Sequence, residues 1–282
     1  MSVIRKYESP IFGDLHVEFY GSANEMADDL VNRKRSDHRF EDDEYEDRSF
    51  VGASRDEAYK MLRSGYQPVV DSLKEKIKIY GKDKRFKSHN DVVGFAPVVP
   101  NAIMGLPKSM VNNVIKPIKT KVIDLYYDMT ASCAIDSDDI IKAGEKMLSV
   151  ILAMEAAGYR FNLYTTQNYY DDCNGCDMVC VKVKSANQPF DLKRMSFPAA
   201  HTAFFRGIGF EWYSKFPIGR YRYGYGHSIF REKEREEVQE EYRRLFGDNI
   251  FCFSATDIIR EGDEADEYIR RILRDEPKRK ER

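Results

Sequence analysis

The pattern of apolar and polar positions is clearest from residue 121 onward, where strand and helix signals alternate. Val122-Ile-Asp-Leu-Tyr-Tyr127 is a β-branched and aromatic run typical of a buried strand. The pattern then predicts a helix over residues 137–157 and a strand over residues 159–166. Such alternation favours a mostly parallel sheet with helices on both faces. The sequence therefore predicts a three-layer α/β fold.

The same periodicity predicts further elements toward the C-terminus. Asn174-Gly175 favours a tight turn inside a hairpin over residues 169–183. The remaining predicted elements are a helix over 201–214, a helix over 228–246, a strand over 249–253 and a helix over 260–274.

The N-terminal part is organised differently, which predicts an extension at residues 1–90 packed against an α/β domain at residues 91–282. A strand is expected over residues 11–20, and residues 32–48 are almost wholly charged, as in a solvated or disordered loop. Ser54 and Glu57 form a capping-box pattern that opens a helix ending near Gly65, and a further helix follows over 68–80.

Residues 91–120 combine proline, glycine and apolar side chains without a clear period. We expect a buried irregular strap that belongs to the α/β domain. Glycine and proline would fix its path, and Val99 and Met110 would anchor it to the core.

Composition limits the classes of protein. A chain of 282 residues, 42% of them hydrophobic, can bury a sizeable core. The net charge of -2 gives no overall electrostatic case for nucleic acid or membrane partners. No apolar run approaches the roughly 20 residues of a membrane span, and the N-terminus lacks a signal-peptide core. We therefore expect no membrane partner. The five cysteines are an odd count, which favours a reducing compartment over a disulfide framework, so we expect a cytoplasmic protein.

The strongest candidate chemistry follows the strand that ends at Tyr127. Asp128, Thr130 and Ser132 form the pattern Asp-x-Thr-x-Ser. Three side-chain oxygens within five residues, at the carboxyl end of a buried strand, can converge on a hard cation such as Mg²⁺.

This arrangement resembles the metal-ion-dependent adhesion site of von Willebrand factor A domains. In that family a later threonine and aspartate supply the fourth and fifth ligands, and Thr202 and Asp257 lie in corresponding places. Two positions depart from the family pattern, because Ile258 replaces the common glycine after the aspartate and His201 precedes the threonine. The resemblance implies a von Willebrand factor A-like fold and a Mg²⁺ site whose shell a partner carboxylate completes. Its ligands would be Asp128, Thr130, Ser132, Thr202 and Asp257.

Two other interpretations of these residues stay open. They can be turn and helix-capping residues in a domain that has lost its metal. Asp128 and Asp257 can also belong to an RNase H-like nuclease, which needs three or four carboxylates for two metal ions. Asp171, Asp172 and Asp177 are available, but they lie in the predicted hairpin, where acidic residues are ordinary.

Two further clusters are candidates for binding. Cys173 and Cys176, with Cys180 nearby, suggest zinc or redox chemistry, but a zinc site usually has four ligands, so half-buried thiols across a hairpin are favoured. Residues 219–226 interleave arginine with tyrosine, which suits stacking on nucleic-acid bases, a protein contact, or packing over a domain face. The contact residues would be Arg220, Tyr221, Arg222, Tyr223 and Tyr225.

A second resemblance is carried by the strap. Its pattern Gly94-x-x-Pro97-x-Val99-Pro100-x4-Gly105-x-Pro107-x-x-Met110 is similar to the signature of a family of unknown activity encoded by tailed bacteriophages. The resemblance spans about residues 11 to 274 and includes an upstream Phe50-Val-Gly52 block. It implies a non-catalytic accessory or structural protein in the cytoplasm of an infected host cell. Its partner would be a protein. The resemblance to von Willebrand factor A domains adds an AAA+ ATPase of the MoxR type as one expectation, because phage and bacterial proteins with that domain often act beside such an ATPase.

Overall fold

The computed structural model describes residues 2–34, 47–80, 86–115, 121–171, 175–217 and 228–274. Its main sheet has six strands in the order β1-β2-β8-β7-β6-β9. β6 pairs in parallel with β7 and β9, and β2 pairs in parallel with β8, whereas β1–β2 and β7–β8 are antiparallel. The chain is therefore a mixed α/β protein with a mostly parallel central sheet. The strands are β1 (Val3–Ser9), β2 (Gly13–Tyr20), β6 (Val122–Asp128), β7 (Arg160–Asp171), β8 (Gly175–Lys184) and β9 (Ile250–Ser254).

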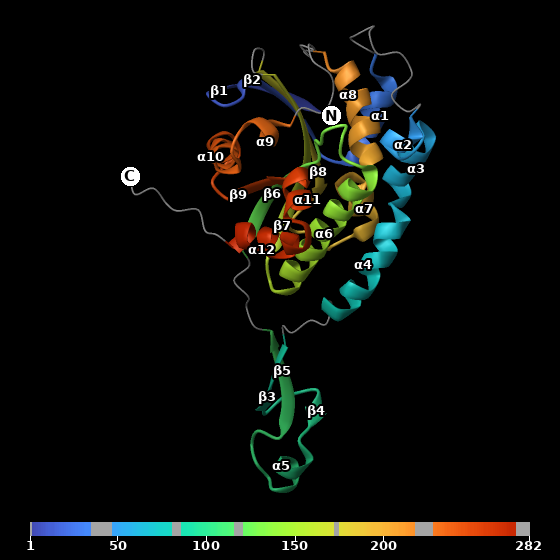
Figure 1. The fold of residues 1–282 in the computed structure, drawn as a ribbon. Coiled ribbons are helices and arrows are strands. Elements are labelled where there is room, and N and C mark those ends of the chain that lie inside the picture. The colour runs from blue at the N-terminus through green and yellow to red at the C-terminus, as the bar shows by residue number, and fades with distance from the viewer. Residues whose placement is uncertain are drawn as a thin grey trace.

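Helices cover both faces of this sheet (Figure 1). One face carries α1 (Ala23–Asn32), α3 (Arg55–Ser64), α4 (Gln67–Tyr80), α6 (Ser137–Ala156), α7 (Leu192–Ala200) and α8 (Phe210–Lys215). The other face carries α9 (Ile229–Glu232) and α10 (Arg235–Phe246). Two separate apolar clusters fill the two layers between helices and sheet. Near α6 lie the short α2 (Arg48–Val51) and the C-terminal helices α11 (Ala255–Glu261) and α12 (Ala265–Arg274).

The elements with strong local signals agree with the sequence predictions. The predicted strand at 122–127 and helix at 137–157 correspond to β6 and α6. The predicted strand at 159–166 and the first arm of the predicted hairpin at 169–183 form one strand, β7, which pairs with β8 as the second arm. The capping box before α3 is formed, with Ser54 and Glu57 bonded in both directions. Most of the charged stretch, residues 35–46, lies outside the described residues.

Other elements differ from the predictions. β1 was not predicted, because it is a largely exposed edge strand with little apolar alternation. The predicted helix at 228–246 is broken into α9 and α10, and the last predicted helix is divided between α11 and α12. The predicted helix at 201–214 is a π-helix over Ala203–Gly209 followed by α8, and Pro198 lies inside α7.

The prediction of a buried strap was wrong. Residues 86–115 form a separate small sheet of β3 (Phe86–Asp91), β5 (Met110–Ile115) and β4 (Ala96–Pro97), with the short helix α5 (Val99–Ile103). Figure 1 shows this unit projecting from the body. Val99 is 56% exposed, and neither it nor the half-buried Met110 belongs to a core cluster. A Cβ on Gly94 would lie 2.0 Å from the carbonyl oxygen of Val111, so this glycine allows two segments of the small sheet to approach closely.

Gly144 marks the closest contact between α6 and α7, and it offers a test of the packing. A Cβ at this position would lie 2.4 Å from both the Ala199 carbonyl oxygen and the Ala200 Cα. We expect Gly144→Ala to lower the free energy of unfolding by about 1–3 kcal/mol through overpacking. In an exposed helix the same change raises the free energy of unfolding by about 1 kcal/mol, so the sign of the measured change distinguishes a packed glycine from an exposed one. Urea denaturation measures the change, with the exposed α6 variant Lys142→Ala as control. A stabilised Gly144→Ala would contradict this packing.

Candidate functional site

Asp128 lies at the carboxyl end of β6, between Thr166 of β7 and Ser254 of β9. Its side chain is fully buried. Oδ1 accepts hydrogen bonds from the Thr130 backbone N–H at 3.0 Å and from the Thr130 hydroxyl at 2.7 Å. Oδ2 accepts a hydrogen bond from the Ser228 hydroxyl at 2.5 Å. The carboxylate is therefore surrounded by donors from its own loop and from the start of α9.

A buried polar cluster extends around Asp128 beneath α9 and α10. The Thr130 hydroxyl accepts a hydrogen bond from the Asn168 backbone N–H at 2.8 Å, which joins β7 to the loop after β6. Burial raises the pKa of Asp128 to about 6, although the hydrogen bonds from Ser228 and Thr130 oppose this change. Burial and the nearby Asp128 charge both raise the pKa of Tyr242. The cluster is a low-dielectric site in which a negative charge is costly.

The other predicted ligands also make contacts with protein groups. The Ser132 hydroxyl accepts a hydrogen bond from the Ala134 N–H at 3.3 Å. The Thr202 hydroxyl is buried and donates to the Ser137 carbonyl oxygen at 3.0 Å. Asp257 closes a capping box at the start of α11, where its Oδ2 accepts from the backbone N–H of Ser254 at 2.9 Å. Burial raises the pKa of Asp257, and its hydrogen bonds with Ser254 lower it by less.

These contacts fit turns and helix caps better than an open coordination shell. β6 and β9 are parallel neighbours, so the fold brings Asp128 and Asp257 to the same edge of the sheet, but each carboxylate is engaged elsewhere. Among the residues that the structure describes, no three His, Cys, Asp or Glu side chains gather in a group that could hold a metal ion. A groove of about 550 Å³ between α6 and the Ile258–Asp266 segment contains none of the five predicted ligands. Mg²⁺ binding therefore stays a prediction.

Arg206 is a site residue that sequence reasoning did not identify. It is almost fully buried, and its guanidinium donates to the carbonyl oxygens of Ser132 at 2.9 Å, Ile135 at 2.6 Å and Phe50 at 3.1 Å. The same group lies 4.1 Å from the centre of the Phe50 ring. Burial lowers the pKa of Arg206. This side chain fixes the loop after Asp128 against α2, and an arginine within an otherwise apolar run was its signal in the sequence.

The remaining predicted clusters have different outcomes. Cys176 and Cys180 are buried in the layer under α10, where burial raises the pKa of both thiols. They are therefore packed in the core, not half-buried across a hairpin. Cys173 lies outside the described residues, as does the Arg/Tyr-rich loop at 219–226. The contacts predicted for Arg220, Tyr221, Arg222, Tyr223 and Tyr225 thus lie in that same undescribed part of the chain.

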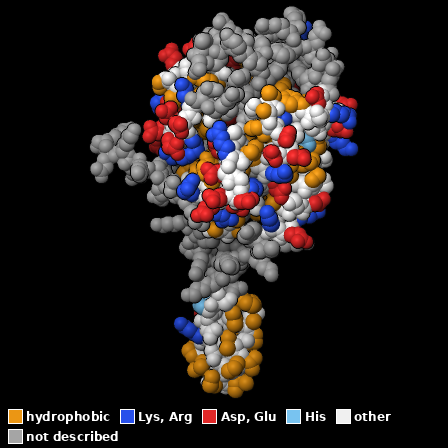
Figure 2. All heavy atoms as spheres, in the orientation of Figure 1, with side chains coloured by type: hydrophobic (Ala, Val, Ile, Leu, Met, Phe, Trp, Pro, Cys, Tyr) orange, Lys and Arg blue, Asp and Glu red, His pale blue; other side chains and the backbone are white. Residues whose placement is uncertain are grey.

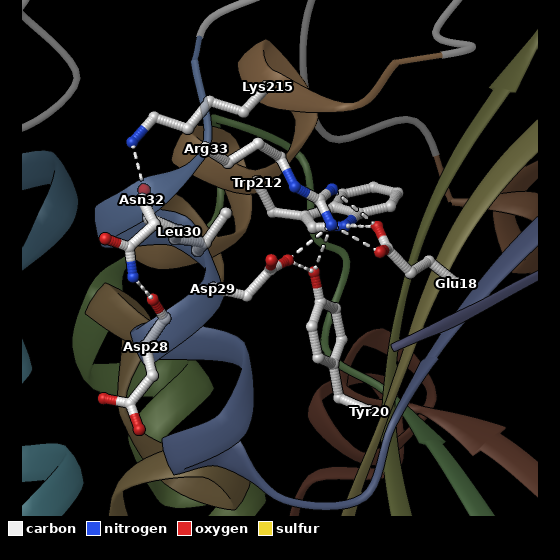
Figure 3. Close-up of polar contacts among 9 residues, drawn as sticks. All are labelled: Glu18, Tyr20, Asp28, Asp29, Leu30, Asn32, Arg33, Trp212 and Lys215. Carbon is white, nitrogen blue, oxygen red and sulfur yellow. Dashed lines mark hydrogen bonds and ion pairs between the residues drawn. The ribbon is translucent and has the colours of Figure 1, made fainter. Parts of the chain in front are cut away.

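A buried ionic network joins β2, the C-terminal end of α1 and α8 (Figure 3). Its Tyr20 and Trp212 belong to the core cluster on the face of the sheet opposite α10. Glu18 is fully buried and accepts two hydrogen bonds from Arg33, at 2.8 and 2.6 Å, and one from the Trp212 indole N–H at 2.7 Å. Arg33 also contacts Asp29 and the hydroxyl of Tyr20. Burial raises the pKa of Glu18, but hydrogen bonds from Arg33 and Trp212 outweigh that effect, so the net change is downward.

The projecting unit carries a second candidate site, an exposed apolar surface that we call the apolar tip (Figure 2). Seven of the eleven exposed large hydrophobic side chains in the described residues lie within residues 92–106. Ile103 is the most exposed, at 81%. Residues 92–107 contain no charged side chain, although 33% of the chain is charged. The apolar tip consists of Val92, Val93, Phe95, Val99, Ile103, Met104 and Leu106.

The fold and these sites define a mixed α/β protein with a buried carboxylate cluster and an exposed apolar projection. Residues 7–277 match the family model described as Domain of unknown function (DUF7192), so the chain belongs to this family. Searches of curated proteins and of solved structures found no match. Within the described ranges, no helix is both long enough and apolar enough to cross a membrane.

Proposed function

We propose that this protein is a non-catalytic protein-binding module and that the apolar tip is its contact surface. The observation that carries the proposal is the concentration of exposed hydrophobic side chains within residues 92–106. Large exposed apolar patches are uncommon on soluble monomers and mark interaction surfaces. Removing such side chains from water is favourable by roughly 25 cal/mol per Å² of apolar area. A protein partner that covers the tip would gain this energy.

The position of Asp177 argues against metal-dependent nuclease chemistry at Asp128. Asp128 is fully buried and accepts three hydrogen bonds. Asp177 pairs in register with Tyr169, whereas Asp128 pairs with Thr166, and odd and even positions of β7 face opposite sides of the sheet. Asp177 therefore points away from the cluster, and it contacts His16 at 3.1 Å. A two-metal site needs carboxylates that converge from the same side.

The biological setting is proposed from the resemblances. A strand that ends in Asp128, lies between two parallel strands and precedes a long helix supports a von Willebrand factor A-like assignment. The strap signature supports a phage-encoded accessory or structural role in the cytoplasm of an infected cell. An AAA+ ATPase of the MoxR type is one partner to test. Mg²⁺ at the Asp128 cluster would be an addition to this role, and the apolar tip does not require it.

Site-specific photo-crosslinking tests the proposed function. A benzoylphenylalanine at position 103 is placed in the full chain, in cells that produce it, and the adducts are identified by mass spectrometry. We expect a defined protein adduct at position 103, because Ile103 is 81% exposed, more than any other side chain of the tip. The control is position 31, because Val31 is 61% exposed on α1 in the body. An adduct pattern at 103 that is absent or identical to that at 31 would contradict the proposal.

A further inference from the structure

We propose that a second copy of this chain covers the apolar tip, so that the protein is a homodimer joined through residues 92–106. This inference rests on the proposed function and names the partner for the same surface. Three observations support a second copy: the exposure of the described side chains in the projecting unit, the distribution of charge around the tip, and the amino-acid composition of residues 86–115.

The described side chains of the projecting unit form no buried core. No described side chain from residue 88 to residue 112 is buried. A small sheet of this kind has little apolar area removed from water, so a surface that covers its exposed apolar side chains would stabilise it. A second copy is available for this contact wherever the chain is made, and its contribution to stability would depend on protomer concentration.

The charge distribution also suits self-association. Most homo-oligomers use a two-fold contact in which a surface patch faces the same patch on the other copy. A charged patch would repel itself, but residues 92–107 carry no charge. The described charged side chains that flank this stretch, Asp91 and Lys108, have opposite signs. Two copies can thus bury the tip without placing like charges from this stretch against each other.

A membrane surface fits these residues less well. Segments that insert into a bilayer interface are rich in tryptophan, tyrosine and basic side chains. Residues 86–115 contain no Trp, Tyr or Arg, and their only lysines are Lys87 and Lys108. A partner of another sequence would need its own uncharged apolar groove, whereas a second copy supplies a matching surface directly.

Sedimentation equilibrium of the full chain tests the inference. From about 1 to about 100 µM, wild type should show a monomer–dimer equilibrium whose average mass rises toward that of the dimer, which gives the dissociation constant. The dimer mass is 65.8 kDa, twice the 32.9 kDa of one chain. Ile103→Glu should sediment at 32.9 kDa, because each copy would bury an unpaired carboxylate in the apolar contact. Val31→Glu introduces the same charge at an exposed apolar position of the body and should remain dimeric.

A milder variant distinguishes weaker association from misfolding of the projecting unit. Val93→Thr keeps the β-branched shape at a side chain that is 73% exposed. It should weaken the dimer about tenfold, because each dimer then buries two additional hydroxyls. An unchanged dissociation constant for Val93→Thr, or a dimeric Ile103→Glu, would overturn the inference.

Failure of this inference can be separated from failure of the proposed function. A monomeric wild type that forms adducts with a different protein at position 103 would overturn the homodimer and leave the binding module intact. A monomeric wild type without adducts at that position would overturn both. A monomer that co-sediments with phosphatidylglycerol vesicles would replace the homodimer with a membrane contact.

Discussion

Glu18→Ala is expected to lower the free energy of unfolding by about 3–5 kcal/mol, because it breaks a buried ion pair from one side. The Arg33 guanidinium would lose its two short contacts with the carboxylate, and the Trp212 indole N–H would lose its acceptor. Neither donor can turn to bulk water easily, since Trp212 is fully buried and the Arg33 side chain is only 17% exposed. Urea denaturation followed by circular dichroism measures the loss.

Two controls separate the ion pair from simple loss of packing. The double variant Glu18→Leu with Arg33→Met should lose much less than the sum of the single changes, because apolar replacement of both partners removes the unpaired charge. Lys74→Ala removes an exposed ion pair with Asp71 and should change stability by less than about 0.5 kcal/mol. A loss below about 1 kcal/mol for Glu18→Ala would show that this network contributes little to stability.

The fold was predictable from sequence where local pattern decides the structure. The run that ends at Tyr127 is β-branched and aromatic, and β6 forms there. The capping box at Ser54 and Glu57 needs only residues three positions apart, so its geometry was present in the sequence itself. β1 escaped prediction because an exposed edge strand needs no apolar alternation.

The polar sites could be predicted only in part, because their partners are far apart in sequence. The Asp128 carboxylate and Thr130 form a local turn, and the motif indicated this pair. Ser228 lies 100 positions from Asp128, and Trp212 lies 194 positions from Glu18. Sequence periodicity carries no information about such pairings, since it reports which face of an element is apolar and not which element covers it.

The strap at residues 91–120 shows again that sequence pattern does not say what covers an apolar surface. Apolar composition at residues 91–120 indicated burial, and the glycines and prolines were expected to fix the path of the chain. Gly94 allows a close approach within the small sheet, because its missing Cβ lets the chain pass the Val111 carbonyl. The prediction of burial failed because hydropathy reports that a surface is better covered, without saying whether the same chain or a partner covers it.

Asp128→Asn is expected to stabilise the protein at pH 7.5 by up to about 3 kcal/mol, because it removes a buried charge. The folded-state pKa of Asp128 is raised to about 6 from the ordinary value of 3.8. Between these values the folded state binds a proton that the unfolded state has released. Wild-type stability should therefore fall as pH rises from about 4 to about 6 and stay low above that range. The asparagine is neutral over this whole pH range and can still accept a hydrogen bond from Thr130. Its contribution to the free energy of unfolding should therefore not vary with pH.

The measurement is the difference in unfolding free energy between wild type and Asp128→Asn from pH 4 to pH 8, in the presence of EDTA. Other titrating groups, including Asp257, are common to both proteins and cancel. Asp263→Asn, at an exposed aspartate, is the control and should differ from wild type by less than about 0.5 kcal/mol. A difference that is constant with pH would contradict the raised pKa of Asp128.

Mg²⁺ then decides whether Asp128 is a metal ligand or a buried structural carboxylate. A cation bound only by the folded state would raise the melting temperature of wild type by mass action, and Asp128→Asn would lose that response. Coordination would also favour the charged carboxylate and remove the stability loss between pH 4 and pH 6. We expect neither effect, because the predicted ligands Thr202, Ser132 and Asp257 already bond to protein groups. A Mg²⁺-dependent rise in melting temperature that disappears in Asp128→Asn would overturn the structural role and restore the adhesion-type site.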